Sequence, residues 1–155
     1  LMLKYYVEGK RILEVGCGIA LASMVLNQRF ANITATDYHP EAEKFLDYNT
    51  ALNEAPEIPF FRTGWDEIEN NLGFFDIIIG SDLLYERGHS ASLSRFINRH
   101  AKKHCDVIIV DPGRGNHRSF TKKMERLRFL CKQRKPCDTE KMERTDKCII
   151  LHFSR

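Results

Sequence analysis

Short apolar runs alternate along this sequence with longer segments of helical period, and this alternation constrains the fold most. Runs of strand length are expected at Arg11–Val15, Ile33–Thr36, Phe60–Arg62, Phe75–Ile79 and Val107–Val110. Helical periodicity is expected over Ala20–Gln28, Pro40–Asn53, Ser90–His104 and His117–Leu127. Near-continuous apolar strands separated by helices indicate a mostly parallel sheet that is covered on both faces. The 155 residues are enough for one domain with one sizeable core.

The end of the chain departs from this alternation. Two more strands are expected, Phe129–Lys135 and Cys148–His152, with only the polar stretch Cys137–Asp146 between them. That stretch is too short and polar for a packed crossover helix, so the last two strands should be antiparallel to each other. The apolar faces expected for the first three helices are Leu21, Met24, Val25 and Phe30, then Ala42, Phe45, Leu46 and Leu52, then Leu93, Phe96, Ile97 and Ala101.

The strongest local motif is Glu14-x-Gly16-x-Gly18, which ends the first strand and leads into a helix. Glycines let the backbone turn tightly and approach a ligand, and the helix start behind them offers N–H groups to an anion. Asp37, at the tip of the second strand, can accept hydrogen bonds from both hydroxyls of a ribose. A plain strand-helix turn with a surface aspartate is the alternative.

Two cofactor classes use such a turn. The dinucleotide motif needs Gly or Ala at the position of Leu21, which is too large. The S-adenosylmethionine (SAM) version carries an acid two residues before the first glycine, and Glu14 supplies it. Ala20 stands where many methyltransferases have a third glycine. The motif therefore favours SAM as the cofactor.

Nearly the whole chain resembles the class I, seven-β-strand methyltransferases, and within them methyltransferase family 16, the protein-lysine methyltransferases of the methyltransferase-like-21 type. The stretches that carry the resemblance are Ile12-Leu-Glu-Val-Gly-Cys-Gly18, Ala35-Thr-Asp-Tyr38, Gly64-Trp-Asp66, Gly80-Ser-Asp-Leu-Leu-Tyr85 and Arg114 with Phe120. The resemblance implies an α/β, Rossmann-like three-layer sandwich. Its seven-stranded, mostly parallel sheet would have the order 3-2-1-4-5-7-6, with strand 7 antiparallel.

The resemblance also implies a site. Trp65 would lie beside the adenine, Asp82 would orient the acceptor amine, and Tyr85 would line its channel, so that replacing Asp82 with Ala abolishes transfer while SAM still binds. Asp82 and Tyr85 are the expected catalytic residues, and no metal is expected. The residues expected to bind the cofactor are Glu14, Gly16, Cys17, Gly18, Asp37, Tyr38, Trp65, Ser81 and Asp82. Asp82 could otherwise cap a helix, and Trp65 and Tyr85 could simply be packed aromatic residues.

A protein lysine is the expected methyl acceptor. Nucleic-acid amino-methyltransferases remain an alternative, because residues 114–144 hold eleven Lys and Arg against four acids, although the two prolines typical of that class are missing from Asp82-Leu-Leu-Tyr85. A small-molecule amine acceptor and a non-catalytic SAM-binding module are further alternatives. We expect a monomeric domain over residues 1–155 that lacks part of the family's N-terminal portion.

The remaining features concern the compartment and other ligands. No apolar run approaches the roughly 20 residues that a membrane span requires, and no signal peptide is evident. Five scattered cysteines without a Cys-x-x-Cys pair argue against a disulfide framework or zinc site and favour the cytoplasm. His100 and His104 would lie one helical turn apart, where we interpret them as cations at a helix end. Arg114, after the fifth strand, is a weaker candidate for contacting the substrate.

Overall fold

The computed structural model describes residues 7–68, 70–86, 88–113, 115–136 and 147–155. Strands and helices alternate until the last two strands. The elements are β1 (Arg11–Val15), α1 (Leu21–Asn27), β2 (Asn32–Asp37), α2 (Ala42–Leu52), β3 (Phe60–Arg62), β4 (Phe75–Ser81), α3 (His89–His100), β5 (Ala101–Asp111), α4 (His117–Arg126), β6 (Leu130–Arg134) and β7 (Ile149–Ser154).

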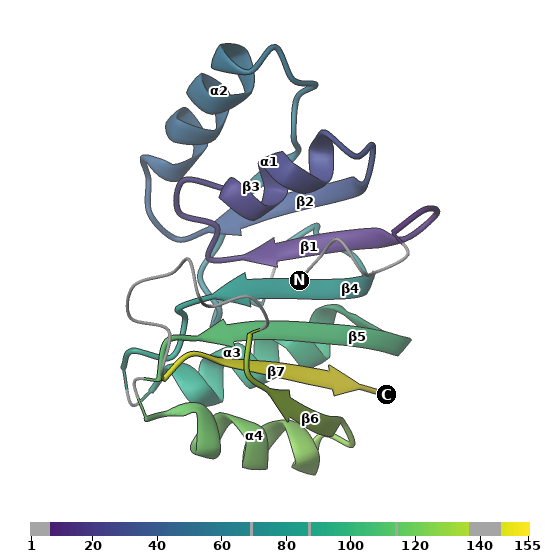
Figure 1. The fold of residues 1–155 in the computed structure, drawn as a ribbon, viewed down its shortest axis with the longest axis vertical. Helices are drawn as coiled ribbons and strands as arrows, with labels where there is room; N and C mark the ends of the chain where they lie inside the picture. The colour runs from purple at the N-terminus through teal and green to yellow at the C-terminus, as the bar shows by residue number, and fades with distance from the viewer. Residues whose placement is uncertain (1–6, 69, 87, 114, 137–146) are drawn as a thin grey trace.

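The strands form one sheet of seven in the order β3-β2-β1-β4-β5-β7-β6 (Figure 1). The pairs from β3 to β5 are parallel, and β7 runs antiparallel to both β5 and β6. The expected sheet order and the antiparallel final pair are therefore confirmed. β1 pairs with both β2 and β4, so the strand order reverses direction there, and open α/β sheets bind ligands at the carboxyl ends of strands at such a point.

Alternate residues of the strands feed two separate cores, one on each face of the sheet. Leu13 of β1 packs in a cluster with Phe96 of α3 and Met124 of α4. Its neighbour Ile12 packs in the other cluster with Leu26 of α1, which also contains Leu46 of α2. Because successive side chains of a strand point to opposite faces, this division gives the three layers that the apolar runs predicted.

The third helix ends earlier than expected. The prediction of helix to His104 is wrong: α3 stops at His100, and β5 begins at Ala101. The polar residues after Ala101 suit a helix by composition, but tertiary pairing decides their conformation. Ala101 pairs with Phe75 of β4, and the register then shifts before Asp106 pairs with Ile77. His100 and the exposed His104 are consequently not one helical turn apart.

Two helices bury only part of the face that their apolar residues suggested, although Met24 of α1 and Ala42 and Leu46 of α2 are buried as expected. On and after α1, Leu21, Val25 and Phe30 are exposed, whereas Met24 and Ser23 are buried. Phe45 and Leu52 of α2 are exposed as well, in contrast to the expectation. Hydrogen bonds orient α1: Ser23 is bound by the buried Glu14, and the amide of Asn27 donates to the carbonyl of Pro56 at 2.6 Å.

The basic segment is described only in part, because Arg114 and residues 137–146 lie outside the described residues. The described part forms α4 and β6, where Arg118, Lys122, Arg126, Lys132 and Arg134 are exposed. Figure 1 shows α4 and β6 at the opposite end of the molecule from α2. Among the described helices, none has the length and apolar character needed to cross a bilayer.

Candidate functional site

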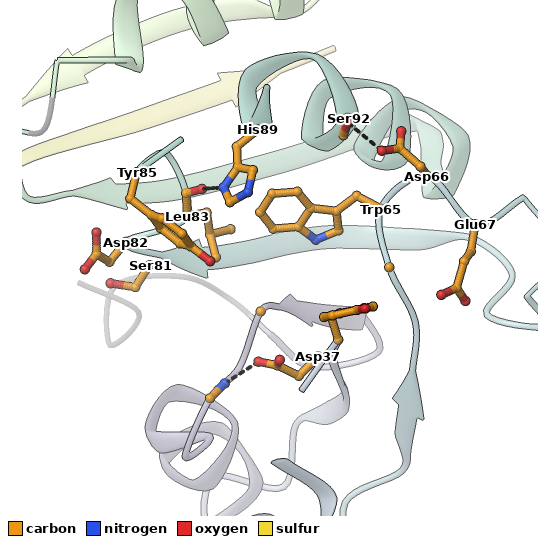
Figure 2. Close-up of a pocket in the computed structure, with 14 residues that line it drawn as sticks. Asp37, Trp65, Asp66, Glu67, Ser81, Asp82, Leu83, Tyr85, His89 and Ser92 are labelled. Carbon is orange, nitrogen blue, oxygen red and sulfur yellow. Dashed lines mark hydrogen bonds between the residues drawn. The ribbon is translucent and has the colours of Figure 1, made fainter. Parts of the chain in front are cut away.

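A cleft of about 630 Å³ lies at the carboxyl ends of β1 to β4. Its walls come from the turn after β1, the last residue of β2, the segment after β3, the loop after β4 and the start of α3 (Figure 2). The lining residues are Gly16, Gly18, Asp37, Tyr38, Gly64, Trp65, Asp66, Glu67, Ser81, Asp82, Leu83, Tyr85, His89 and Ser92. A volume of this size is typical of small-molecule sites, which hold roughly 300–1,000 Å³.

The turn after β1 depends on its two glycines. Gly16 has a left-handed backbone (φ +61°), and a Cβ there would lie 2.6 Å from Cδ2 of Leu83. Gly18 is also left-handed (φ +55°), but a Cβ on it would meet no atom of the described residues within 4 Å. Gly16 is thus required by packing, whereas the space beside Gly18 is open. Ala20, where many methyltransferases have a third glycine, is left-handed too (φ 60°).

Asp37 connects this turn to the end of β2. Its Oδ2 accepts a hydrogen bond of 2.8 Å from the backbone N–H of Gly18. Its Oδ1 accepts a bond of 2.8 Å from the backbone N–H of His39. A carboxylate has about four lone-pair sites, so both oxygens keep acceptor capacity for a ligand. Tyr38, the next residue, is 70% exposed at the edge of the cleft.

Glu14 and Cys17 lie behind the turn, outside the lining of the large cleft. Glu14 is buried and accepts hydrogen bonds from the backbone N–H and the hydroxyl of Ser23. It thereby satisfies one of the free N–H groups in the first turn of α1, where the N-cap residue Ala20 makes no side-chain bond. Burial, only partly offset by the Ser23 bonds, raises the pKa of Glu14.

The thiol of Cys17 is buried beside the same turn. Burial, together with the nearby carboxylates of Glu14 and Asp37, raises its pKa to about 12. A thiol with such a pKa stays protonated at neutral pH and is a poor nucleophile. Cys17 therefore acts as a small packed side chain in this turn.

The segment after β3 supplies the other wall. Trp65 is half-buried and lines the cleft. Asp66 accepts hydrogen bonds of 2.8 Å from the guanidinium of Arg95 and from the hydroxyl of Ser92. These two bonds lower the pKa of Asp66, and the bond from Arg95 has the larger effect. Because α3 carries Ser92 and Arg95, the Asp66 contacts tie the segment after β3 to that helix.

The end of β4 and the loop after it carry Ser81, Asp82 and Tyr85. Ser81 is the last residue of β4 and is exposed. Asp82 is half-buried and left-handed (φ 54°), and its backbone N–H donates 2.9 Å to the carbonyl of Val110 in β5. Tyr85 is 56% exposed and lines the cleft. Aspartate is among the residues that best tolerate this backbone conformation.

The charged side chains that line the cleft are mostly acidic. Among the described residues that line it, four are carboxylates, at Asp37, Asp66, Glu67 and Asp82, and none is a lysine or arginine. Carboxylates gathered in a cleft attract cations and repel phosphates. The arrangement therefore suits a ligand or substrate that carries positive charge.

The model of a family described as lysine methyltransferase matches residues 3–127. The chain belongs to this lysine methyltransferase family. The match includes every strand and helix from β1 to α4.

The curated relatives that the chain matches are distant in sequence and longer. The chain is 26% identical over 136 residues to the calmodulin-lysine N-methyltransferase of Arabidopsis thaliana, covering 79% of this chain and 43% of that protein. It is 28% identical over 115 residues to the electron transfer flavoprotein beta subunit lysine methyltransferase of Xenopus laevis, covering 73% and 46%. The chain thus spans less than half the length of these relatives.

A solved structure of another methyltransferase has a fold similar to that of this chain. The magnesium protoporphyrin IX methyltransferase of Synechocystis PCC 6803, solved with bound SAM, is similar with a TM-score of 0.75 and 17% identity, covering 96% of this chain and 71% of that one. At this identity the likeness concerns the fold alone.

Several lining residues of this family member were not predicted from the sequence. They are Gly64, Asp66, Glu67, Leu83, His89 and Ser92. Gly64 and Asp66 flank Trp65, and Leu83 lies inside Asp82-Leu-Leu-Tyr85. Their positions next to expected site residues could have indicated that they line the cleft. His89 and Ser92 belong to α3. Arg114, the weaker candidate, lies outside the described residues.

Proposed function

We propose that this chain is the cofactor-binding and catalytic part of a SAM-dependent protein-lysine N-methyltransferase. The observation that carries the proposal is the acidic cleft at the carboxyl ends of β1 to β4, in a member of the lysine methyltransferase family. SAM carries a sulfonium and a lysine side chain carries an ammonium, so both suit carboxylate walls. The free thiols of Cys17, Cys105, Cys131 and Cys148 fit a reducing compartment such as the cytoplasm.

The residues of the cleft fit the cofactor. The turn leaves open space beside Gly18, which suits close approach of the amino acid end of SAM. Asp37 keeps acceptor capacity for the ribose hydroxyls, and Trp65 offers an aromatic surface for the adenine. Tyr38 and Ser81 lie at the edges of the same cleft. Glu14 and Cys17 hold the turn from behind.

When bound, SAM supplies an electrophilic methyl group, and the acceptor must present a free lone pair to it. A lysine with an ordinary pKa of about 10.4 costs about 4.6 kcal/mol to present as a neutral amine at pH 7. Desolvation by Trp65, Leu83 and Tyr85 would lower the pKa of the amine. The charge of Asp82 favours the protonated amine, so we assign Asp82 to orienting the amine rather than deprotonating it.

The experiment combines methyl transfer with identification of the acceptor. The chain is incubated with SAM labelled in its methyl group and a cell lysate, and the products are divided between RNase and protease. We expect label that only protease removes and that appears as methyl-lysine after acid hydrolysis. Label that only RNase removes would assign the activity to nucleic acid, and label that resists both would indicate a small acceptor.

Asp82→Asn is the companion variant, because asparagine keeps the left-handed backbone that Asp82 adopts. We expect it to lose transfer while SAM binding, measured by calorimetry, stays within about threefold of the parent. Turnover equal to that of the parent would overturn the role of Asp82. Cofactor binding by the parent without transfer to any component of the lysate would indicate a non-catalytic binding module.

A further inference from the structure

His89, the first residue of α3, lies between two of the aromatic side chains that line the cleft, Trp65 and Tyr85. Its ring centroid is 5.0 Å from that of Trp65 and 4.6 Å from that of Tyr85. Both contacts are edge-to-face, with interplanar angles of 80° and 78°, a favourable geometry for aromatic pairs. Figure 2 shows the imidazole between the Trp65 indole and the Tyr85 phenol. One side chain thus connects the segment after β3 with the loop after β4.

The imidazole also holds the backbone of that loop. Nδ1 of His89 lies 3.0 Å from the carbonyl oxygen of Leu83. A carbonyl oxygen can only accept, so Nδ1 carries the hydrogen and donates it. The other ring nitrogen, Nε2, lies 3.3 Å from a carboxylate oxygen of Glu86. His89 is therefore anchored to the loop through Nδ1, and its ring makes edge-to-face contacts with both aromatic residues.

The peptide that His89 holds follows a strained position. Asp82, the preceding residue, has a left-handed backbone (φ 54°), which aspartate tolerates better than most residues but which still depends on support from its surroundings. Two hydrogen bonds give this support. The N–H of Asp82 donates to Val110 at 2.9 Å, and the carbonyl of Leu83 accepts from His89. The first bond comes from β5 and the second from α3.

The side chain of Leu83 transmits this position to the turn after β1. Leu83 is 4% exposed, and its methyl groups fill the space that a Cβ on Gly16 or on Gly80 would need, at 2.6 and 2.5 Å. A shift of the Leu83 peptide would therefore move a packed side chain that contacts the glycine turn. The His89 bond supports Asp82, Tyr85 and the turn together.

We propose that His89 is a positioning residue for methyl transfer. It fixes the loop that carries Asp82 and Tyr85 through the Leu83 carbonyl, and it holds the Trp65 indole through its ring. The expected effect of His89 on kcat rests on the proposed function, whereas its expected effect on the Trp65 side chain does not. In this assignment His89 acts through its neighbours and does not contact the reacting atoms.

Two substitutions separate the two contacts. His89→Phe keeps an aromatic ring and removes the donor to Leu83. His89→Asn keeps an N–H donor near the position of Nδ1 and removes the ring. The matched controls are His104→Phe and His104→Asn, because His104 is exposed on β5, outside the cleft. Trp65 is the only tryptophan of the chain, so its fluorescence reports this one contact without cofactor or substrate.

In His89→Phe we expect kcat to fall about tenfold, as for one lost hydrogen bond, with KM for SAM within about twofold and unchanged Trp65 emission. In His89→Asn we expect kcat within about threefold of the parent, while the emission shifts to the red and iodide quenches it more strongly. All measurements are made at a temperature where circular dichroism shows each variant folded. A purely structural role would reduce kcat and SAM binding together, in proportion to the folded fraction.

Parental kcat in His89→Phe would overturn the loop assignment, and parental Trp65 emission in His89→Asn would overturn the indole assignment. If one variant fails to fold, the other still decides its own contact. A parent chain that transfers no methyl group would count against the proposed function, whereas the Trp65 fluorescence would still decide whether His89 holds the indole.

Discussion

The backbone N–H of Gly18 donates a hydrogen bond of 2.8 Å to Oδ2 of Asp37, which joins the turn after β1 to the last residue of β2. The same carboxylate accepts from the N–H of His39 through its other oxygen. Asp37 therefore shapes the cleft and lines it at the same time. A substitution there should affect both the turn and the ligand that the turn holds.

Asp37→Asn should weaken SAM binding. Asparagine has one acceptor oxygen, so either Gly18 or His39 loses its partner, and the ribose loses a charged acceptor. Hydrogen bonds to charged groups contribute roughly 1.5–3 kcal/mol, which predicts a loss in affinity of about 10- to 100-fold by calorimetry. Asp47→Asn, on the exposed surface of α2, is the matched control. Parental affinity in Asp37→Asn would remove Asp37 from the cofactor site.

Gly18→Ala and Gly9→Ala should separate backbone strain from ligand contact. Both glycines are left-handed (φ +55° and +68°), and a Cβ on either would meet no atom within 4 Å. Each variant should lose roughly 1–2 kcal/mol of unfolding free energy in urea titrations. Only Gly18 lines the cleft, so only Gly18→Ala should also weaken SAM binding beyond its effect on folding. Equal SAM affinity in the two variants would contradict this.

The sequence predicted the sheet well because strand burial is strongly patterned. The apolar run that contains Ile77, Ile78 and Ile79 identified a central strand, and the short polar gap before the last strand indicated the antiparallel pair. The end of α3 was not predictable from local composition. Lys102, Lys103 and His104 suit a helix, but strand pairing at Ala101 and the bond of His100 to Gly73 end it.

The candidate site was predictable where a motif carries it. The stretches that carry the family resemblance contain Gly16, Gly18, Asp37 and Asp82, and these four residues line the cleft. His89 could not be found this way, because its contacts with Trp65 and Tyr85 depend on how α3 begins after the loop. The inward face of α1 was only partly predicted: Met24 is buried as expected, but the buried Glu14 orients the helix through Ser23, a polar residue.

Glu14→Gln should change how stability depends on pH. Burial raises the pKa of Glu14, so the folded chain holds this proton more tightly than the unfolded chain. Its contribution is complete below the unfolded pKa of about 4.3 and is lost as pH rises through the folded value. Glutamine keeps an acceptor oxygen for Ser23 and does not titrate. The parent should therefore lose more stability than the variant between pH 4 and pH 7, measured by urea unfolding.

The control for that comparison is Glu43→Gln, on the exposed face of α2. Parallel pH profiles of the parent and Glu14→Gln would contradict the prediction. The same variant tests whether Glu14 contacts the cofactor. SAM affinity within about threefold of the parent would assign Glu14 to orienting α1, whereas a loss above about tenfold would assign it to direct contact.

His100→Asn should flatten the stability profile in mildly acidic solution. His100 is buried, its Nδ1 lies 2.9 Å from the carbonyl oxygen of Gly73, and its Nε2 has no hydrogen-bond partner among the described residues. Burial lowers its pKa, so the unfolded chain takes up this proton more readily. The contribution of His100 is complete above the unfolded pKa of about 6.5 and is lost as pH falls toward the folded value. One proton gives a slope of at most about 1.4 kcal/mol per pH unit.

The asparagine amide can still donate to Gly73, but the ring contact of His100 with Phe96, at 4.6 Å between centroids, is lost. His100→Asn should therefore be less stable at pH 7.5 and yet lose less stability than the parent on titration to pH 5. Urea unfolding at several pH values measures this difference, with the exposed His104→Asn as control. An unchanged slope in His100→Asn would mean that His100 is protonated as readily in the folded chain as in the unfolded one.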